Sequence, residues 1–321
     1  MPKFIFEGIE YNALEGETVL DCLLRAAERV TNSCKSGICH SCLLKSSAKL
    51  DALSQKGLSP SKKEAGFFLS CQQKAYSDLE VFRPDTSTLL VEGEITSQDK
   101  VSDSVVIIKI KTQDDYPFKA GQFTNIIRED GVCRSYSIAS QTGSHELEFH
   151  IRKVPNGELS NWLYNEDLKG VSVKLSEPLG ECCLNSSMEG KDLLLIGIGT
   201  GLAPLYGVLK DSLCQERMGA INLFHGGLTV AGLYLIEGLK KIEKENDSFS
   251  YYPVVLKGKD KKGFIKGDLV EVVKNFDFDK NNTVVMICGD PQLVNSLKQK
   301  IFLAGVPSKN ILSDPFVSRS T

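Results

Sequence analysis

The sequence lacks a long hydrophobic run, and it lacks a marked excess of charge of either sign. No apolar stretch among its 321 residues is as long as a membrane-spanning helix, and Glu7 stands where a secretion signal would need its apolar core. A formal net charge of -3 argues against a broad basic surface for nucleic acid. These absences predict a cytoplasmic protein with neither a membrane nor a nucleic-acid partner.

Signs of disorder are also missing, because 41% of the residues are hydrophobic and 25% are charged, as in ordinary globular proteins. The chain is too long for one small core and suggests about two or three domains. Cysteine, by contrast, is abundant, with ten residues. In a reducing compartment we expect metal ligands and buried thiols rather than disulfides.

Three of the cysteines stand in one short loop. Cys34, Cys39 and Cys42 follow the spacing C-x4-C-x2-C, and Cys71 comes later in Phe-Leu-Ser-Cys-Gln. This is the plant-type [2Fe–2S] ligand pattern, in which each iron takes two thiolates. The alternatives are a zinc site and unrelated cysteines, but structural zinc sites usually pair two short C-x2-C hooks, and only one is present. The spacing therefore favours an iron–sulfur cluster.

The segment around this loop predicts a small mixed fold. Residues 3–7 and 9–13 indicate a hairpin, residues 18–30 an amphipathic helix capped by Thr18, and a short strand ends near Phe82. Cys22 lies inside the expected helix and is interpreted as a core residue. The segment resembles plant-type ferredoxin domains of β-grasp fold. His40 departs from that family, which usually has glycine there, and we expect its side chain to face either a flavin or an electron-accepting partner.

The next segment changes to β-strands. Expected strands cover residues 89–95, 105–110, 122–127, 135–139 and 146–154, which predicts a small antiparallel barrel. Within it, Arg134-Ser135-Tyr136-Ser137 is similar to the R-x-Y-S signature of ferredoxin–NADP reductase-type flavoproteins. The resemblance implies that Tyr136 stacks on a flavin ring, Ser137 hydrogen-bonds near its reactive nitrogen and Arg134 neutralises phosphate.

A second motif in this segment resembles the G-x-x-S-x-x-L element of the same family. There a glycine turn opens a helix whose N-terminus binds the cofactor pyrophosphate. A pyrophosphate element favours FAD over FMN. On the preceding strand Arg152 is a candidate phosphate partner, whereas for His150 a solvated strand position is an equally good interpretation. The candidate contacts from this motif and strand are Ile151, Arg152, Gly157, Leu159 and Ser160.

The last segment alternates strands with helices, which predicts a parallel sheet with helices on both faces. Expected strands cover residues 192–197, 220–225, 250–256 and 283–288, and expected helices cover residues 202–213, 230–245, 267–275 and 291–304.

Two glycine motifs end strands of this sheet. Gly199-Thr200-Gly201 and Pro204 belong to a G-x-G-T-G-x-A-P run with a strand before it and a helix after it, the context that a dinucleotide site requires. Cys288-Gly289-Asp290-Pro291 is similar to the C-G-x-P motif of the reductase family, in which the cysteine lies beside the nicotinamide. Residues 224–229 contain no Arg or Lys for a 2′-phosphate, which predicts NADH, with NADPH possible.

The C-terminal Asp314-Pro-Phe316 resembles the acidic-x-aromatic element that closes these reductases near the flavin. The candidate catalytic residues are therefore Ser137, Cys288 and Asp314, with Phe316 as a further flavin contact.

The whole chain resembles a ferredoxin-fused reductase of ferredoxin–NADP reductase type. This implies a multidomain protein with a β-grasp [2Fe–2S] ferredoxin domain at 1–88, a β-barrel FAD domain at 89–187 and an α/β nicotinamide domain at 188–321. Flavin accepts a hydride and releases single electrons, so the expected order is NADH, FAD, cluster and partner. No catalytic triad is needed for such chemistry.

The resemblance leaves the partner open. It is expected to be a component of a multicomponent oxygenase; the alternative is a sugar dehydrase, as with the CDP-6-deoxy-glucoseen reductase type of 3,6-dideoxysugar biosynthesis. Two other hypotheses are a redox-sensing module without turnover and a free-flavin reductase.

Overall fold

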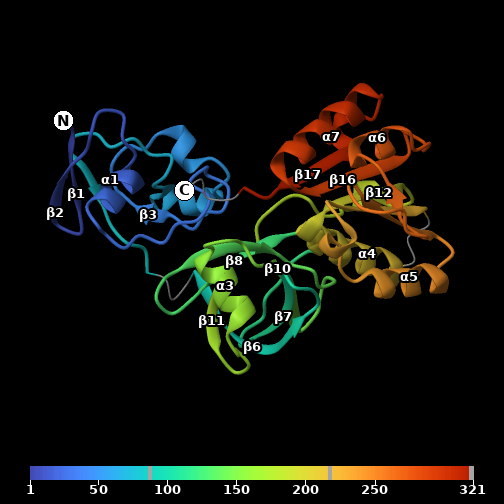
Figure 1. The fold of residues 1–321 in the computed structure, drawn as a ribbon. Helices are drawn as coiled ribbons and strands as arrows, with labels where there is room; N and C mark the ends of the chain where they lie inside the picture. Colours follow the sequence, from blue (N-terminus) through green and yellow to red (C-terminus); the bar gives the residue numbers. More distant parts are fainter. Residues whose placement is uncertain (86–88, 216–218, 318–321) are drawn as a thin grey trace.

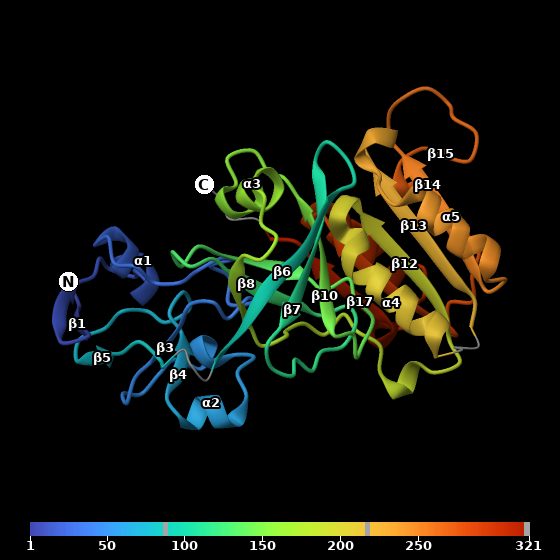
Figure 2. The same ribbon diagram turned by 90° about the horizontal axis from the view of Figure 1, so that it is seen from below.

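The computed structural model describes residues 1–85, 89–215 and 219–317, which form three units with separate β-sheets (Figure 1). The barrel lies between the N-terminal unit and the C-terminal α/β unit in both views (Figures 1 and 2). The predicted boundary between the first two domains, at residues 88 and 89, borders on residues 86–88, which lie outside the described residues. No helix within the described ranges is long and apolar enough to cross a membrane.

The N-terminal unit has the mixed sheet of a β-grasp fold. Strand β1 pairs antiparallel with β2 and parallel with β5, and a second small sheet joins β3 to β4. Helices α1 and α2 complete the unit. The bounds are β1 Lys3–Phe6, β2 Ile9–Asn12, α1 Val19–Arg25, β3 Leu43–Lys45, α2 Pro60–Glu64, β4 Phe67–Leu69 and β5 Leu79–Val81.

Helix α1 begins as the sequence predicts and ends earlier. The Thr18 hydroxyl accepts the Asp21 N–H at 3.1 Å, and Cys22 lies in the core, 1% exposed, as expected. The helix stops at Arg25 because Ala27 adopts a φ of 62° while the N–H groups of Ala27 and Glu28 bond back into the last turn. This is a Schellman-type end formed without glycine, so the predicted extension to residue 30 is wrong.

The middle unit is a closed antiparallel barrel with strand order β10-β7-β6-β11-β8-β9. A bridge between Ile138 and Phe149 joins β9 to β10 and closes it. The sequence did not predict β11. The bounds are β6 Leu90–Lys100, β7 Val105–Thr112, β8 Phe123–Ile127, β9 Cys133–Ser137, β10 Glu146–Arg152, α3 Glu158–Asn165 and β11 Ser172–Ser176.

The C-terminal unit is a parallel sheet in the order β15-β14-β13-β12-β16-β17, with α4 and α5 on one face and α6 and α7 on the other (Figure 1). Leu193 and Leu195 of β12 belong to one core cluster, whereas Leu194 and Ile196 belong to the other. Neighbouring residues of a buried parallel strand thus support helices on opposite faces. The bounds are β12 Asp192–Ile198, α4 Leu202–Cys214, β13 Ile221–Gly227, α5 Ile236–Glu245, β14 Phe249–Val255, β15 Ile265–Lys266, α6 Leu269–Lys274, β16 Thr283–Gly289, α7 Pro291–Leu303 and β17 Ile311–Pro315.

Helix α5 begins six residues later than the expected start at residue 230. Residues Val230–Gly232 form a separate 3₁₀ turn, and Leu235 adopts a φ of 56°, which an α-helix cannot include. The strands β15 and β17 at the two edges of the sheet were not predicted.

Candidate functional site

The four cysteines of the N-terminal unit form two thiol pairs. Cys34 contacts Cys39, and Cys42 contacts Cys71. No three ligating side chains in the part of the chain that the structure describes converge on one metal ion. A two-iron cluster does not require such a group, because each iron takes two protein thiolates and the remaining ligands are inorganic sulfides. Two adjacent pairs therefore fit a [2Fe–2S] cluster better than a single zinc ion.

Backbone N–H groups of the cysteine loop point at the thiols. The N–H groups of Ser36 and Cys39 donate to Cys34 Sγ at 3.3 and 3.4 Å. The Cys39 thiol, with smaller contributions from these N–H groups, holds the pKa of the Cys34 thiol well below its usual range. A metal binds thiolate rather than thiol, so these donors prepare the sulfur as a ligand. The donor set thus fits the cluster.

The loop has one buried side and one exposed side. Cys39 is 2% exposed and lies toward the barrel, whereas Lys35, Ser36 and Ile38 are exposed. His40, with a φ of 52°, lines a cavity of about 280 Å³ between the N-terminal unit and the barrel. Its Nε2 lies 3.3 Å from the Cβ position of Gly57 in the same unit, and among the described residues its buried Nδ1 finds no hydrogen-bond partner.

Strand β9 carries the flavin signature. Thr124 and Phe123 of β8 lie opposite Tyr136 and Ser137, so the signature is anchored in the barrel wall. The Tyr136 ring is partly exposed and available for stacking, and burial raises the pKa of its hydroxyl, which stays protonated. Arg134 is also partly exposed, and its Nη1 donates to the Cys133 carbonyl at 2.6 Å. The strand therefore offers the Tyr136 ring for stacking against an aromatic group and the Arg134 guanidinium for binding an anion.

The turn before α3 has no room for a side chain at Gly157. A Cβ there would lie 2.5 Å from Ser160 Oγ, which itself accepts the Val154 N–H at 3.2 Å. The Ser160 hydroxyl therefore closes the turn that presents the helix N-terminus. Leu159 and Ile151 are fully buried in the barrel core, which leaves only their backbone groups for a cofactor.

The glycine run between β12 and α4 is tightly enclosed. A Cβ on Gly201 would lie 2.0 Å from the Cys288 carbonyl oxygen, and Gly199 has a φ of 57°. The Arg152 guanidinium of the barrel lies 3.0 Å from the Cβ position of Gly199. The two predicted anion-binding elements, one from each unit, therefore adjoin. Thr200 is partly exposed and Pro204 is buried in the first turn of α4.

The three candidate catalytic residues come together from two units. Cys288 of β16 lies opposite Asp314 of β17, and the Ser137 side chain of the barrel lies close enough to the Asp314 carboxyl to affect its pKa. Burial raises the pKa of Asp314 to about 6, against the opposite effect of Ser137. Phe316 follows, with its N–H donating to the Gly289 carbonyl at 2.8 Å.

Burial also raises the pKa of Cys288, which is 0% exposed and therefore a thiol rather than a thiolate. Its Sγ lies 3.7 Å from Cys182 Sγ, a contact that sequence reasoning missed. The Asp290 carboxylate accepts the N–H groups of Gln292 and Leu293 as the N-cap of α7, directly before Pro291 at the first helical position. Asp290 thus orders the backbone after Cys288.

The interpretation of His150 as a solvated strand residue is wrong. It is 4% exposed, its Nδ1 lies 2.9 Å from the Tyr234 hydroxyl and its Nε2 lies 2.8 Å from Glu148 Oε1. The α/β unit packs against this side of β10 and buries it. Periodicity within one strand gives no sign of such packing between domains.

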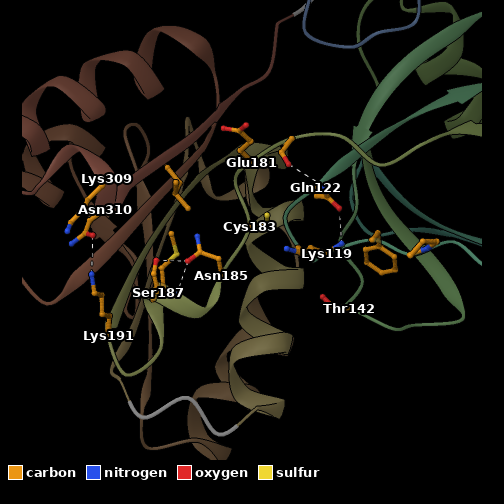
Figure 3. Close-up of a pocket in the computed structure, with 15 residues that line it drawn as sticks. Lys119, Gln122, Thr142, Glu181, Cys183, Asn185, Ser187, Lys191, Lys309 and Asn310 are labelled. Atoms are coloured by element: carbon orange, nitrogen blue, oxygen red, sulfur yellow. Dashed lines mark hydrogen bonds between the residues drawn. The ribbon is translucent and has the colours of Figure 1, made fainter. Parts of the chain in front are cut away.

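A wider hollow of about 830 Å³ lies between the barrel and the α/β unit (Figure 3). Lys119, Lys191 and Lys309 are among its lining residues, and Lys191 Nζ donates to Asn310 Oδ1 at 3.1 Å. Lys191 and Asn310 precede β12 and β17, so the hollow lies at the amino ends of these strands. Ligands of open α/β sheets bind at the carboxyl ends, where the glycine run lies. None of the predicted site residues lines this hollow.

Three family models match successive parts of the chain: the 2Fe-2S iron-sulfur cluster binding domain at residues 5–76, the oxidoreductase FAD-binding domain at 92–183 and the oxidoreductase NAD-binding domain at 195–299. The aromatic O-demethylase reductase subunit of Amycolatopsis sp. is 30% identical over 260 residues, which cover 75% of this chain and 76% of that protein. The chain belongs to the ferredoxin-fused reductases.

Two further comparisons cover almost the full length of this ferredoxin-fused reductase. The reductase component of the naphthalene 1,2-dioxygenase/salicylate 5-hydroxylase systems of Ralstonia sp. is 27% identical over 318 residues, with 96% of each chain covered. The crystal structure of the Amycolatopsis cytochrome P450 reductase GcoB has a TM-score of 0.71 and 24% identity, and all of both chains is covered.

These findings confirm the predicted fold class and cofactor set. The protein is an NAD(P)H-dependent oxidoreductase with a [2Fe–2S] ferredoxin domain, an FAD-binding barrel and a nicotinamide-binding α/β domain.

Proposed function

We propose that electrons pass from NADH to FAD beside Ser137, Cys288 and Asp314, then to a cluster held by Cys34, Cys39, Cys42 and Cys71, and on to an oxygenase component. The observation that carries this proposal is the placement of strand β9. Ser137 at its end lies beside Asp314 of the nicotinamide unit and lowers the pKa of that carboxyl, and Cys133 at its start lies beside Ser41 of the cysteine loop. One strand therefore adjoins both partners of the flavin.

The chain's own residues have distinct tasks in this proposal. FAD, when bound, converts a two-electron donor into single electrons. Tyr136 offers a ring face to it, and Arg134 and the N-terminus of α3 after Gly157 bind its phosphates. Arg152 neutralises phosphate where the two units meet. The proposed nicotinamide cradle consists of Gly199, Thr200, Gly201, Pro204, Gly289, Asp290 and Pro291.

Ser137 and Asp314 orient the reacting edge of the flavin from the barrel side and the nicotinamide side. The neutral Cys288 thiol adds a small, uncharged surface beside the nicotinamide. Phe316, fixed by its bond to Gly289, covers the flavin ring.

NADH is the proposed donor because the turn after β13, from Leu228 onward, carries no cation in residues 224–229. Lys257 also lies next to this turn, because its backbone N–H donates to the Leu228 carbonyl at 2.8 Å. The ratio of kcat/KM for NADH to that for NADPH tests the choice. A ratio below one would overturn it.

An oxygenase component is the proposed acceptor because curated relatives of similar length carry the names of dioxygenase and monooxygenase reductase components. The dideoxysugar alternative stays a prediction that shares the same layout. Turnover assays that combine the reductase with a Rieske oxygenase, a di-iron oxygenase or a nucleotide-sugar dehydrase separate the two.

The electron route itself is tested by Cys39→Ser, which removes one thiolate of the Cys34–Cys39 pair. We expect NADH-dependent reduction of cytochrome c to be lost, since that acceptor takes electrons from the cluster. Reduction of ferricyanide, which the flavin performs directly, should survive. Retention of cytochrome c reduction by a cluster-free variant would show that the route bypasses the cluster.

A further inference from the structure

A fully bonded amide is buried between the barrel and the cysteine loop. Asn125, in the middle of β8, is 1% exposed and belongs to none of the cofactor motifs. Its Nδ2 donates to the Cys39 carbonyl at 2.7 Å and to Ser176 Oγ at 3.1 Å. Its Oδ1 accepts the Ser135 hydroxyl at 2.8 Å. Every polar atom of this side chain therefore has a partner.

The two ends of the amide touch different redox elements. Cys39 is one of the four proposed cluster ligands. Ser135 stands between Arg134 and Tyr136 of the flavin signature and lies directly opposite Asn125 in the β8–β9 pairing. A single side chain thus spans from the flavin strand to the cluster loop.

A cavity interrupts the packing beside the loop at this point. The cavity of about 280 Å³ that His40 lines also has Asn125, Ser41 and Ser176 in its wall. A void leaves its lining without contacts, so the position of the loop depends on directed bonds. A buried amide without partners is costly, which ties the loop to one place relative to β8.

A second link in the same interface lies farther from the thiols. Lys62, which is mostly buried, forms an ion pair with Glu177 of the barrel. It contacts neither Cys39 nor the flavin signature by any bond that the described residues show. A variant at the Lys62 link therefore reports on contact between the two units, whereas a variant at Asn125 also reports on the placement of Cys39.

We propose that Asn125 is a positioning residue that fixes the Cys39 side of the cluster against the flavin strand and thereby sets the rate of the flavin-to-cluster step. The inference rests on the proposed electron route. In that step one electron leaves the reduced flavin and one cluster iron passes from ferric to ferrous; two such steps reoxidise the flavin when the external acceptor takes the first electron from the cluster between them. The N–H bond to the Cys39 carbonyl also polarises a ligand peptide, which tunes the cluster through its surroundings.

The test compares Asn125→Asp, which keeps the shape and the Ser135 acceptor but replaces the donor to Cys39, with Asn125→Ala. Lys62→Gln is the matched control at the other link. Anaerobic stopped-flow mixing with NADH follows flavin and cluster reduction separately. Hydrogen–deuterium exchange follows residues 36–43, and electron paramagnetic resonance follows the reduced cluster.

We expect both Asn125 variants to slow cluster reduction about tenfold, as the loss of a buried hydrogen bond implies, with flavin reduction changed by less than about twofold. Exchange of residues 36–43 should accelerate and the resonance of the reduced cluster should shift. Lys62→Gln should leave the resonance and the ratio of the two rates unchanged. If Asn125→Asp fails to load its cluster, the rate of cluster reduction and the resonance of Asn125→Ala, which adds no charge, test the inference.

Two results would overturn the inference. One is a loaded Asn125 variant with the wild-type rate of cluster reduction and the wild-type resonance. The other is an equal fall in flavin and cluster reduction, because that would be general destabilisation. Failure of the wild-type protein to reduce its own cluster with NADH would instead refute the electron route.

Discussion

Asp314 shows how a single carboxyl couples stability to chemistry in this reductase. Its folded-state pKa is raised to about 6 by burial, above the ordinary value of 3.8. The protonated form therefore favours folding, and this contribution is complete below about pH 4 and is lost as the pH rises through about 6. At neutral pH the carboxylate is held at a cost, beside Ser137 and Cys288.

We expect Asp314→Asn to stabilise the protein at pH 7.5 by roughly 1–2 kcal/mol, after allowance for partial exposure, and to have no such effect at pH 4. The same variant should slow flavin reduction by NADH and remove an inflection near pH 6 from its rate profile. Thermal unfolding at the two pH values and stopped-flow rates between pH 5 and 8 measure both effects. An unchanged inflection would assign it to another group.

Gly201 has a different constraint, since any side chain would collide with the Cys288 carbonyl oxygen at 2.0 Å. We expect Gly201→Ala to displace the glycine run from the end of β16 and to weaken NADH binding at least tenfold, equivalent to ~1.4 kcal/mol. Titration of the oxidised protein with NAD⁺ measures the binding loss. Gly238→Ala, at an open position on α5, is the control and should bind NAD⁺ normally.

At the scale of elements, β13 supports the glycine run from the neighbouring strand. His225 of β13 is 0% exposed, and burial lowers its pKa to about 4, so the ring is neutral. The Gly199 carbonyl lies 3.2 Å from Nε2, which must donate to it, and Nδ1 then accepts from the Tyr251 hydroxyl at 3.2 Å. Hydrogen bonds from Tyr251 of β14 through His225 of β13 thus fix Gly199, where the backbone turns.

We expect His225→Ala to raise the KM for NADH roughly tenfold, as the loss of a buried bond to a strained turn implies, while kcat with ferricyanide changes little. Tyr251→Phe should have a smaller effect in the same direction. Because the ring is neutral above about pH 4, neither effect should depend on pH between 6 and 8. Steady-state kinetics at three pH values measure KM and kcat for both variants. A fall in kcat with no change in KM would contradict the role of His225 in holding the glycine run.

The sequence predicted the strands and motifs well where local patterns determine them. The apolar strands β12, β13, β14 and β16 lie within a few residues of their expected bounds. The end of α1 and the start of α5 were missed because Ala27 and Leu235 adopt left-handed conformations, which these residue types rarely take and which no local sequence signal marks. Asn125 escaped for a similar reason, since its partners are distant in sequence and no local signal marks them.

In the whole molecule, the predicted hydride-transfer elements and the predicted cluster ligands lie in different units. The flavin and nicotinamide elements come from the barrel and the α/β unit, whereas the four cysteines belong to the N-terminal unit alone. The cofactor sites therefore depend on different parts of the chain.

We expect removal of the cluster with an organic mercurial to abolish cytochrome c reduction and to leave FAD bound and ferricyanide reduction intact. Reconstitution with iron and sulfide should restore the lost activity, which excludes irreversible damage as its cause. Absorption spectra and the two assays before and after reconstitution provide the measurement. Loss of flavin together with the cluster would show that the sites are interdependent.

The unequal exposure of the two sides of the cysteine loop also bears on how many electrons are lost to dioxygen. Cys39 is covered by the barrel, and the exposed edge is formed by Lys35, Ser36 and Ile38. If the proposed cluster occupies the loop, we expect dissolved dioxygen to reach it from that edge and to draw off electrons as superoxide when no acceptor is bound. An electron acceptor that docked at this edge would cover it, so its binding would both collect the electrons and suppress their loss to dioxygen.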